Sequence, residues 1–328
     1  MIWLSVTVAL APVPAAAEDE PWTVNLMIEN DSFFHIADRH YTNGMYVSAT
    51  SNSDPDCAAC RYLADHLMIE NPDPEKTYRF GGFAGQNMFT PEDLSLNPPD
   101  PKDRPYGGWV YVGARLYRET ENVLDRAEVN IGWVGPGSGA DAVQRWWHAL
   151  HWFGGVPPEG WHSQIKDEPG VELSEQRIWR RWGTVGPFEA EVLPEANVSF
   201  GNVFTYAAAG ATLRFGQRLH ADWGAPRIPP ALSGSDFVAY ERVKPFAWYG
   251  YVGFEGRAVV RNIFLDGNSF QHSANVEKKP LVGDLVVGAA VLSRYFSFYA
   301  SYTVRSREFK TQKGDDAFFS FTVTVPAG

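Results

Sequence analysis

The sequence predicts an all-β chain that folds into a twelve-stranded antiparallel transmembrane β-barrel, with a short helix inserted in an extracellular loop. In segment after segment, such as 296–304 and 319–325, apolar or aromatic residues alternate with small or polar ones. The expected strands are about ten residues long, as a tilted strand must be to cross a bilayer. The connections alternate in character, as in outer-membrane barrels. Together with the signs of export described below, these observations favour a barrel over a soluble β-sandwich.

The expected strands run from one end of the chain to the other without a domain boundary. They cover 22–30, 43–52, 78–87, 107–117, 125–134, 171–182, 187–199, 205–216, 246–264, 281–293, 296–306 and 317–325. If the N-terminus lies in the periplasm, odd-numbered strands run outward, and the connections after them lie at the outer rim. The long connections expected at that rim are 31–42, 88–106, 135–170 and 265–280. The long connections 53–77 and 217–245 then lie on the periplasmic side.

The composition argues against some classes of protein and leaves others open. The 328 residues carry a net charge of -11, which argues against nucleic acid as a partner, because phosphates need clustered Lys and Arg. The same acidity fits binding of a divalent cation. Aromatic residues make up 14% of the chain, which suits the aromatic girdles of a membrane barrel but equally suits a carbohydrate-binding protein. In addition, no apolar run reaches the roughly 20 residues of a membrane-spanning helix.

The N-terminal segment has the features of a secretory signal. Residues 1–13 are apolar, and Ala15-Ala16-Ala17 precede an acidic run, as small residues precede a cleavage site. We therefore expect a signal peptide over 1–17 and a mature outer-membrane β-barrel domain over 18–328.

Two cysteines, Cys57 and Cys60, lie three positions apart in the first periplasmic connection. Two ligands do not make a zinc site, and no βαβ pattern surrounds them to support a redox motif. In an exported protein this spacing predicts a small local disulfide.

Polar side chains gather where the first two strands open. Asn30 and Asp31 end the first expected strand, and Thr42 immediately precedes the second. A hairpin that only has to turn would use Gly, Pro, Asn and Asp. A carboxamide, a carboxylate and a hydroxyl at one rim predict a site, although hairpin chemistry with a solvated loop remains the alternative.

The connection after the fifth strand contains a predicted helix over 140–153. Val143, Trp146, Trp147 and Leu150 form an apolar stripe at helical spacing, which we expect to pack against the barrel wall or lipid. A second stripe is polar and consists of Asp141, Gln144, His148 and His151. An imidazole beside a carboxylate suits activation of water, and this helix shares a rim with Asn30, Asp31 and Thr42. The alternative is that the helix His is only a surface or packing residue.

Motifs along the chain support a family assignment through their order and spacing. They are 29–31, 39–44, 85–91, 103–109, 134–136, 144–148, 160–164 and 201–204. Across these motifs, and over nearly all of the mature chain, the sequence resembles the lipid A 3'-O-deacylase family of Gram-negative outer membranes.

The resemblance implies a calcium-dependent hydrolase whose substrate is lipid A, the anchor of lipopolysaccharide, in the outer leaflet. The bond cleaved would be the ester that holds the 3' acyloxyacyl chain. By motif match, His148 would be the general base, with Asn30, Asp31 and Thr42 as further site residues and Gln144 one helical turn from His148. Physical chemistry allows the same mechanism: Ca²⁺ prefers hard oxygen ligands, and Asp31 with nearby backbone oxygens would supply them. We expect a monomer.

Two other functions stay open from the sequence alone. An outer-membrane phospholipase would need a Ser nucleophile, for which Ser32 and Ser48 are the candidates. A non-enzymatic barrel, either a pore or a structural protein, would have a water-filled lumen and a rim insertion without chemistry.

Overall fold

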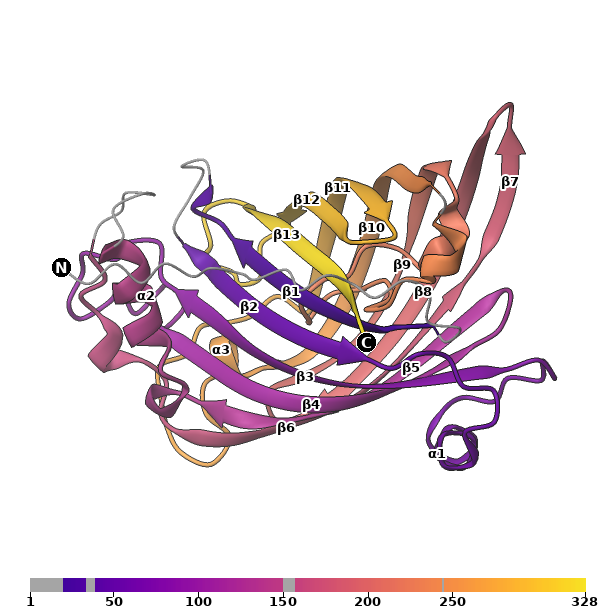
Figure 1. Ribbon diagram of the computed structural model, residues 1–328. Helices are drawn as coiled ribbons and strands as arrows, with labels where there is room; N and C mark the ends of the chain where they lie inside the picture. Colours follow the sequence, from indigo (N-terminus) through magenta and orange to yellow (C-terminus); the bar gives the residue numbers. More distant parts are fainter. Residues whose placement is uncertain (1–19, 34–38, 150–156, 244) are drawn as a thin grey trace.

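The computed structural model describes residues 20–33, 39–149, 157–243 and 245–328, so the expected signal peptide lies outside the described residues. The described chain forms one closed antiparallel β-barrel, which confirms the expected fold class (Figure 1). The strands are β1 (Trp22–Asn30), β2 (His40–Thr50), β3 (Thr77–Thr90), β4 (Gly107–Glu119), β5 (Val123–Val134), β6 (Glu168–Trp179), β7 (Arg181–Val185), β8 (Phe188–Gly201), β9 (Phe204–Gln217), β10 (Phe246–Asn262), β11 (Leu281–Ser293), β12 (Ser297–Arg305) and β13 (Asp316–Ala327). The α-helices are α1 (Ala58–Leu67), α2 (Ala140–Ala149) and α3 (Ile263–Asp266).

The thirteen labelled strands of the described chain make twelve barrel strands, because β6 and β7 are two parts of one strand of the barrel. Ile178 of β6 pairs with Glu195 of β8, and Arg181 of β7 pairs with Val192 in the same register. The barrel closes through the pairing of β1 with β13 and of β6 with β8. Because the number of barrel strands is even, the first strand starts and the last strand ends at the same rim.

The connections divide between the two rims as strand parity predicts. The rim that carries α2, here called the outer rim, holds the connections 31–39, 91–106, 135–167, 202–203, 263–280 and 306–315. The opposite, periplasmic rim holds 51–76, 120–122, 186–187, 218–245, 294–296 and both ends of the described chain. Helix α1 therefore lies at one rim and α2 at the other (Figure 1).

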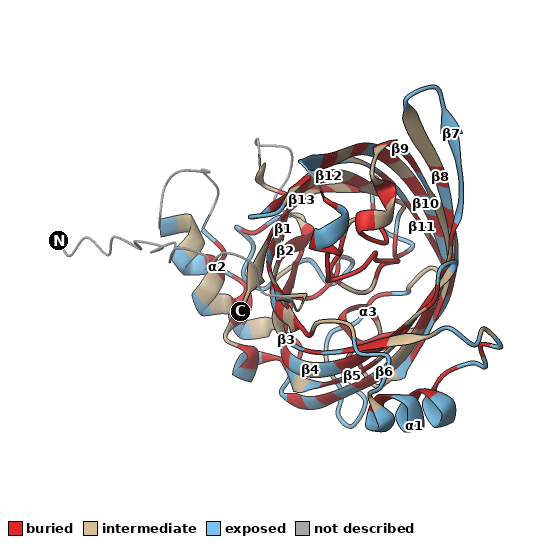
Figure 2. Cartoon of the chain, turned by 45° about the vertical axis from the view of Figure 1, so that its right-hand side comes forward, coloured by how far each residue is buried: buried red, intermediate tan, exposed pale blue. Residues whose placement is uncertain are grey.

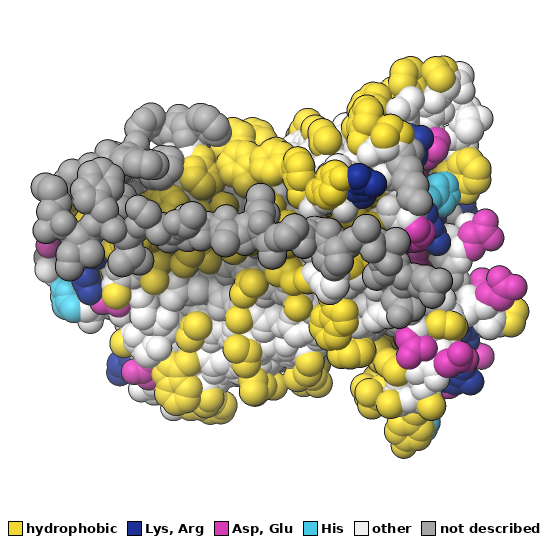
Figure 3. All heavy atoms as spheres, viewed as in Figure 1, with side chains coloured by type: hydrophobic (Ala, Val, Ile, Leu, Met, Phe, Trp, Pro, Cys, Tyr) yellow, Lys and Arg dark blue, Asp and Glu magenta, His cyan; other side chains and the backbone are white. Residues whose placement is uncertain are grey.

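Alternation along the strands gives the barrel an apolar outer surface and a polar lumen. In β13, Ser320, Thr322 and Thr324 point into the lumen and are buried, whereas Val323 is exposed on the outside. In Figure 3, the coloured side chains along the middle of the visible wall are apolar, and charged ones lie toward its two ends. This is the arrangement that a bilayer requires of a barrel that crosses it. Separately, none of the helices in the described part of the chain is both long enough and apolar enough to span a membrane.

The periplasmic connection 218–245 folds back into the barrel and fills the lumen, where Figure 2 shows chain inside the ring of strands. We call this connection the plug. Its Asp236 backbone oxygen accepts a hydrogen bond from Asn25 Nδ2 (2.7 Å), and its carboxylate accepts one from Ser48 Oγ (2.8 Å) and pairs with Arg115. Polar groups that point into a closed barrel need such partners, because a buried polar group without one is costly.

The plug argues against the pore alternative. That alternative requires a water-filled lumen. Beside Arg227, Glu255 and Asp284 the described residues leave a cavity of about 30 Å³, which has room for about two water molecules. A wider cavity of about 810 Å³, bordered by His220, Glu241 and Arg242 of the plug, opens at the periplasmic rim. The plug lies between this cavity and the outer rim, so the two do not form the continuous water-filled lumen that a pore requires.

We predict that the plug is a main source of stability. Asp236→Ala leaves buried Arg115 with Glu128 as its ion-pair partner, 3.2 Å away. Removing one partner of a buried ion pair lowers the free energy of unfolding by about 3–5 kcal/mol where the other charge is left unpaired, and because Arg115 keeps Glu128 we expect a loss toward the lower end of that range. Thermal unfolding of the purified barrel in detergent should therefore show a clearly lower midpoint for this variant.

The matched control is Glu241→Ala, which removes an exposed carboxylate from the same connection. Glu241 pairs with the equally exposed Arg242, so little should change. Equal midpoints for the two variants would contradict the prediction.

Candidate active site

Four of the five site residues expected from the sequence line one pocket at the outer rim. The pocket lies between the outer face of the barrel wall and α2, which stands outside the ring of strands in Figure 2. Its lining residues are Asn30, Ser32, Thr42, Asn43, Met88, Val143, Gln144, Trp147 and His148. The cavity measures about 10 Å³, which is room for about one water molecule. Asp31, the fifth expected residue, is not among the lining residues.

Strand alternation aims Asn30 at this pocket. The preceding residue, Glu29, points into the lumen, where its carboxylate accepts hydrogen bonds from Tyr41 Oη (2.8 Å) and from the Ile228 backbone N–H (3.3 Å). Successive side chains of a strand point to opposite faces. Asn30 therefore points to the outside of the wall, although α2 keeps it almost completely buried.

A β-bulge aims Thr42 at the same pocket. The ladder between β2 and β3 shifts register between Tyr41 and Asn43, so Thr42 is the extra residue. Bulges occur at barrel rims and re-aim side chains. Thr42 Oγ1 lies 2.7 Å from Thr90 Oγ1, and this hydrogen bond fixes the direction of the hydroxyl.

Helix α2 approaches the wall closely because of Gly108. A Cβ atom at this position would lie 2.3 Å from Ala140 Cβ and 2.4 Å from Ser138 Oγ, so no larger residue fits here without displacing the start of α2. Gln86 Nε2 donates a hydrogen bond to the Ser138 backbone oxygen (2.7 Å) and ties the same turn to β3. The helix is thereby held on the outer face of the barrel.

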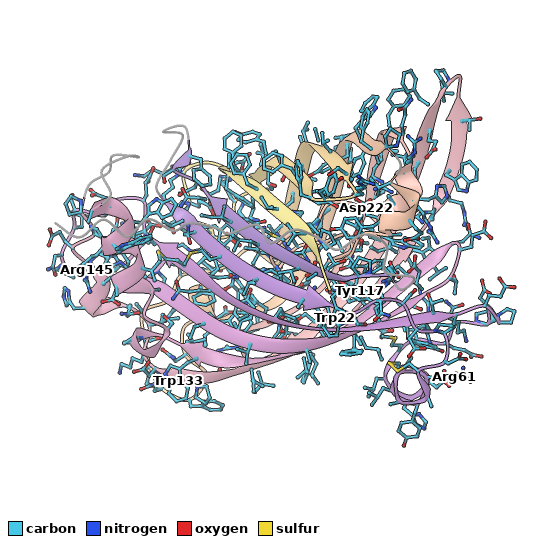
Figure 4. The ribbon with its side chains drawn as sticks, viewed as in Figure 1. Trp22, Arg61, Tyr117, Trp133, Arg145 and Asp222 are labelled. Atoms are coloured by element: carbon cyan, nitrogen blue, oxygen red, sulfur yellow. A yellow bond between two sulfur atoms is a disulfide. The ribbon has the colours of Figure 1, made fainter. Side chains whose placement is uncertain are left out.

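The two stripes expected on this helix do not face separate surfaces. The side toward the pocket combines members of both, namely Val143, Gln144, Trp147 and His148. Trp146 of the apolar stripe is 58% exposed, and Asp141 of the polar stripe pairs with Arg145 on the side away from the wall (Figure 4). Leu150 and His151 lie outside the described residues. The helix was expected from its periodicity, but its orientation depends on the close contact at Gly108.

Trp161 fixes the amide of Gln144, a role that sequence reasoning did not assign to it. Trp161 Nε1 donates a hydrogen bond to Gln144 Oε1 (2.6 Å), and both side chains are buried. The amide nitrogen, Gln144 Nε2, is also buried and has no hydrogen-bond partner among the described residues. This leaves a donor available on a residue that lines the pocket. The position of Trp161 in the motif 160–164 was its only sequence signal.

Asp31 supports the loop beside the pocket. Its carboxylate accepts a hydrogen bond from the Arg39 backbone N–H, across the segment 34–38 that lies outside the described residues. Its neighbour Asn30 accepts hydrogen bonds through Oδ1 from the backbone N–H (2.8 Å) and Oγ of Ser32. Within the described ranges, no group of three or more His, Cys, Asp or Glu residues could hold a metal ion. The side-chain atoms of Asn30 and Asp31 that could bind a metal ion include oxygens, which are the ligands that calcium prefers.

A charged network next to the site joins the first residues of β2 and β13 to the connection 91–106. His40 Nδ1 lies 2.8 Å from Asp316 Oδ1, and His40 Nε2 lies 3.3 Å from Asp103 Oδ1. Burial works to raise the pKa of Asp103, but hydrogen bonds from His40 and from the backbone N–H groups of Glu92 and Arg104 hold that pKa below its usual range. These contacts hold the start of β2, and with it the end of the β1–β2 connection, against β13 and the connection 91–106.

Comparisons with known proteins agree with the barrel and its location. The family model of outer membrane protein LpxR matches residues 2–326. Among solved structures, LpxR from Salmonella typhimurium has a TM-score of 0.73 and 19% identity, covering 92% of this chain and 99% of that one. The β domain of the Bordetella autotransporter BrkA has a TM-score of 0.42 and 12% identity, covering 94% and 98%. No curated protein sequence matches the chain.

The family model spans almost the entire sequence, including every motif on which the resemblance rested. The likeness to the Salmonella protein extends over nearly the whole barrel, so the shared fold does not come from one part of the chain. The chain is therefore an outer-membrane β-barrel that belongs to the LpxR family.

Proposed function

We propose that the chain is a lipid A 3'-O-deacylase, which hydrolyses the ester that holds the 3' acyloxyacyl chain of lipid A. One observation carries the proposal: the pocket lies on the outer face of the wall, at the outer rim. A lipid of the outer leaflet reaches that face laterally, without entering the plugged lumen. Membership of the LpxR family supports an outer-membrane enzyme that acts on lipid A.

In the proposed reaction, His148 is the general base. It takes a proton from a water molecule, and the resulting hydroxide attacks the ester carbonyl carbon. The bond between this carbon and the sugar oxygen then breaks, and the proton held by His148 passes to that oxygen. The pocket suits this step because it places the imidazole beside a space of about one water molecule.

Gln144 is proposed to stabilise the charge that develops on the carbonyl oxygen. Its Nε2 is the donor left without a partner among the described residues, while Trp161 holds its Oε1. A donor that is fixed before the reaction stabilises an oxyanion without reorganisation. Trp161 therefore acts as a positioning residue, and Asn30 and Thr42 complete the polar side of the pocket.

Calcium is the proposed cofactor, and Asp31 and Asn30 with nearby backbone oxygens would hold it. When bound, the ion would add positive charge near the ester carbonyl. The support is the set of oxygen atoms around Asn30 and Asp31, together with the absence of a free cysteine thiol among the described residues. We also propose that the enzyme works as a monomer.

A phospholipase with a Ser nucleophile is the second candidate function, because Ser32 lines the pocket. Its hydroxyl donates to Asn30 Oδ1, so it is engaged with a carboxamide. Ser48, the other candidate, faces the lumen, where it donates to Asp236 and accepts from Asn25 (3.0 Å). The geometry therefore leaves Ser32 as the residue to test.

We predict that His148→Ala lowers turnover of lipid A by about 10²- to 10⁴-fold, the usual contribution of general base catalysis. The barrel should remain folded, because His148 belongs to an inserted helix and makes no contribution to the strand ladder. Release of the 3' acyl chain from purified lipid A, measured by mass spectrometry, checks this.

His162→Ala is the control, since His162 is exposed in the same connection and does not line the pocket. Ser32→Ala should retain most of the activity. Loss of activity in the Ser32 variant, together with near-normal turnover in the His148 variant and hydrolysis of phospholipid, would favour the second candidate.

We also predict that Trp161→Phe lowers kcat by about tenfold, whereas Gln144→Ala, which removes the oxyanion donor itself, lowers it by about 10²-fold. Trp146→Phe on the exposed side of α2 is the control and should leave kcat unchanged. In the Gln144→Ala background, Trp161→Phe should cost nothing further, because both changes remove the same interaction. An additive loss would show that Trp161 acts independently of Gln144.

A third prediction concerns the metal. Excess chelator should abolish hydrolysis while the barrel remains folded, and added calcium should restore it. Asp31→Asn should raise the calcium concentration needed for half-maximal activity, because it removes the negative charge from a proposed ligand. Full activity in excess chelator would contradict the calcium proposal and leave the rest of the mechanism to be judged separately.

A further inference from the structure

We propose that α1 lies in the lipid interface of the inner leaflet and contacts phospholipid through its exposed apolar side. The helix belongs to the connection 51–76 at the periplasmic rim and lies outside the ring of strands (Figures 1 and 2). This inference rests on the outer-membrane location of the barrel and is independent of the reaction proposed above.

One side of α1 packs directly on the outer wall. Cys60, Ala64 and Met68 recur at helical spacing and are buried against Tyr78 of β3 and Leu116 of β4. The disulfide between Cys57 and Cys60, expected from their spacing, is present and links the N-cap to the first turn. The helix is therefore a fixed part of the barrel surface.

The ladder register gives the depth of α1 in the membrane. Leu116, which α1 covers, pairs directly with Phe80 on the neighbouring strand. Phe80 is 51% exposed on the outer wall, and its ring meets that of Trp22 edge to face at 5.4 Å. Aromatic side chains of this kind form the girdles at the membrane–water interface. Helix α1 thus lies at the level of the periplasmic girdle.

A charged cluster on the outer wall pins the end of α1 at this level. Arg118, Asp125 and Arg177 face outward on adjacent strands, and both arginines hydrogen-bond to the Asp125 carboxylate. Each arginine also donates to the backbone oxygen of Ile69, just after α1, with Arg177 Nη2 at 2.9 Å. Glu175 of β6 accepts from the Ile69 N–H. Charged groups at the edge of an apolar band need ion-pair and hydrogen-bond partners of this kind, because the transfer of an unpaired charge into lipid is costly.

The side of α1 turned away from the wall carries three large apolar side chains and His66, whose ring lies 4.2 Å from that of Tyr62. Its exposed residues Tyr62, Leu63 and Leu67, with the adjacent Ile69, are between 45% and 64% exposed. We call these four the lipid-facing patch of α1. Arg61 and Asp65 lie on another side of the helix, and Figure 3 shows apolar side chains gathered over this part of the molecule. An amphipathic helix with such a patch lies in the interface plane.

The charge of the connection indicates which lipid chemistry is involved. Residues 51–76 contain six acidic and two basic side chains, so attraction to anionic headgroups does not hold the helix at the membrane. The patch instead continues the apolar surface of the wall that begins at Phe80. The partner is therefore the acyl and glycerol region of uncharged phospholipid.

Site-directed spin labelling of the full chain tests this inference. Both native cysteines are bonded to each other, so an introduced cysteine is the one free thiol in the described chain. Leu67→Cys places a label in the patch, Asp65→Cys places one on the charged side of the same helix, and Val112→Cys on the apolar wall is the lipid reference. The barrel is reconstituted in vesicles of phosphatidylcholine alone, and accessibility to oxygen is compared with accessibility to a water-soluble nickel complex.

We expect the ratio of oxygen to nickel accessibility at Leu67 to exceed that at Asp65 several-fold and to approach that at Val112. A label at Leu67 that is as accessible to nickel in vesicles as the label at Asp65 would overturn the proposal. Protection of Leu67 from both reagents would also overturn it, since the patch would then be covered by protein.

Discussion

The need to satisfy every backbone polar group within the bilayer is the constraint on which the rest of this structure depends. It is met by closing the sheet, through β1 with β13 and β6 with β8, so that the wall has no free edge. Closure gives the wall two faces, and strand alternation assigns each side chain to one of them. Glu29 enters the lumen and Asn30 faces the outside for this reason alone. The location of the candidate site on the membrane side of the wall follows from it.

The polar lumen that closure creates has to be filled, and the plug fills it. Its partners are spread around the barrel: Asp236 meets Asn25 and Arg115, and Arg227 pairs with Asp284. Most of the charged groups inside the barrel therefore serve to hold the plug. A lumen used in this way is closed to substrate. Chemistry on a membrane lipid then has to take place on the outer wall, where the lipid is.

Polar residues on the outer wall also have to be shielded from lipid, and at each rim one helix shields them. At the outer rim, α2 lies over Asn30 and Thr42, and the space left beneath it is the pocket. At the periplasmic rim, the end of α1 lies over Asp125 and the two arginines that bind it. The physical problem is the same in both places. The difference is that α2 brings an imidazole and a carboxamide to the wall, whereas α1 brings a backbone carbonyl and an apolar surface.

The sequence by itself determined the barrel, its strand count, the rim of each connection and four of the residues that meet in the pocket. Period-two alternation is local, so the bounds 22–30 and 281–293 agree with the structure, and parity then brings Asn30 and His148 to one rim. Only the tertiary structure decided which side of α2 faces the wall, that Trp161 orients Gln144, and that 218–245 turns inward. Each of these depends on contacts between residues far apart in the chain, such as Asn25 with Asp236. No local pattern encodes such a contact, because the energetic need for a partner arises only once the barrel has closed and excluded water.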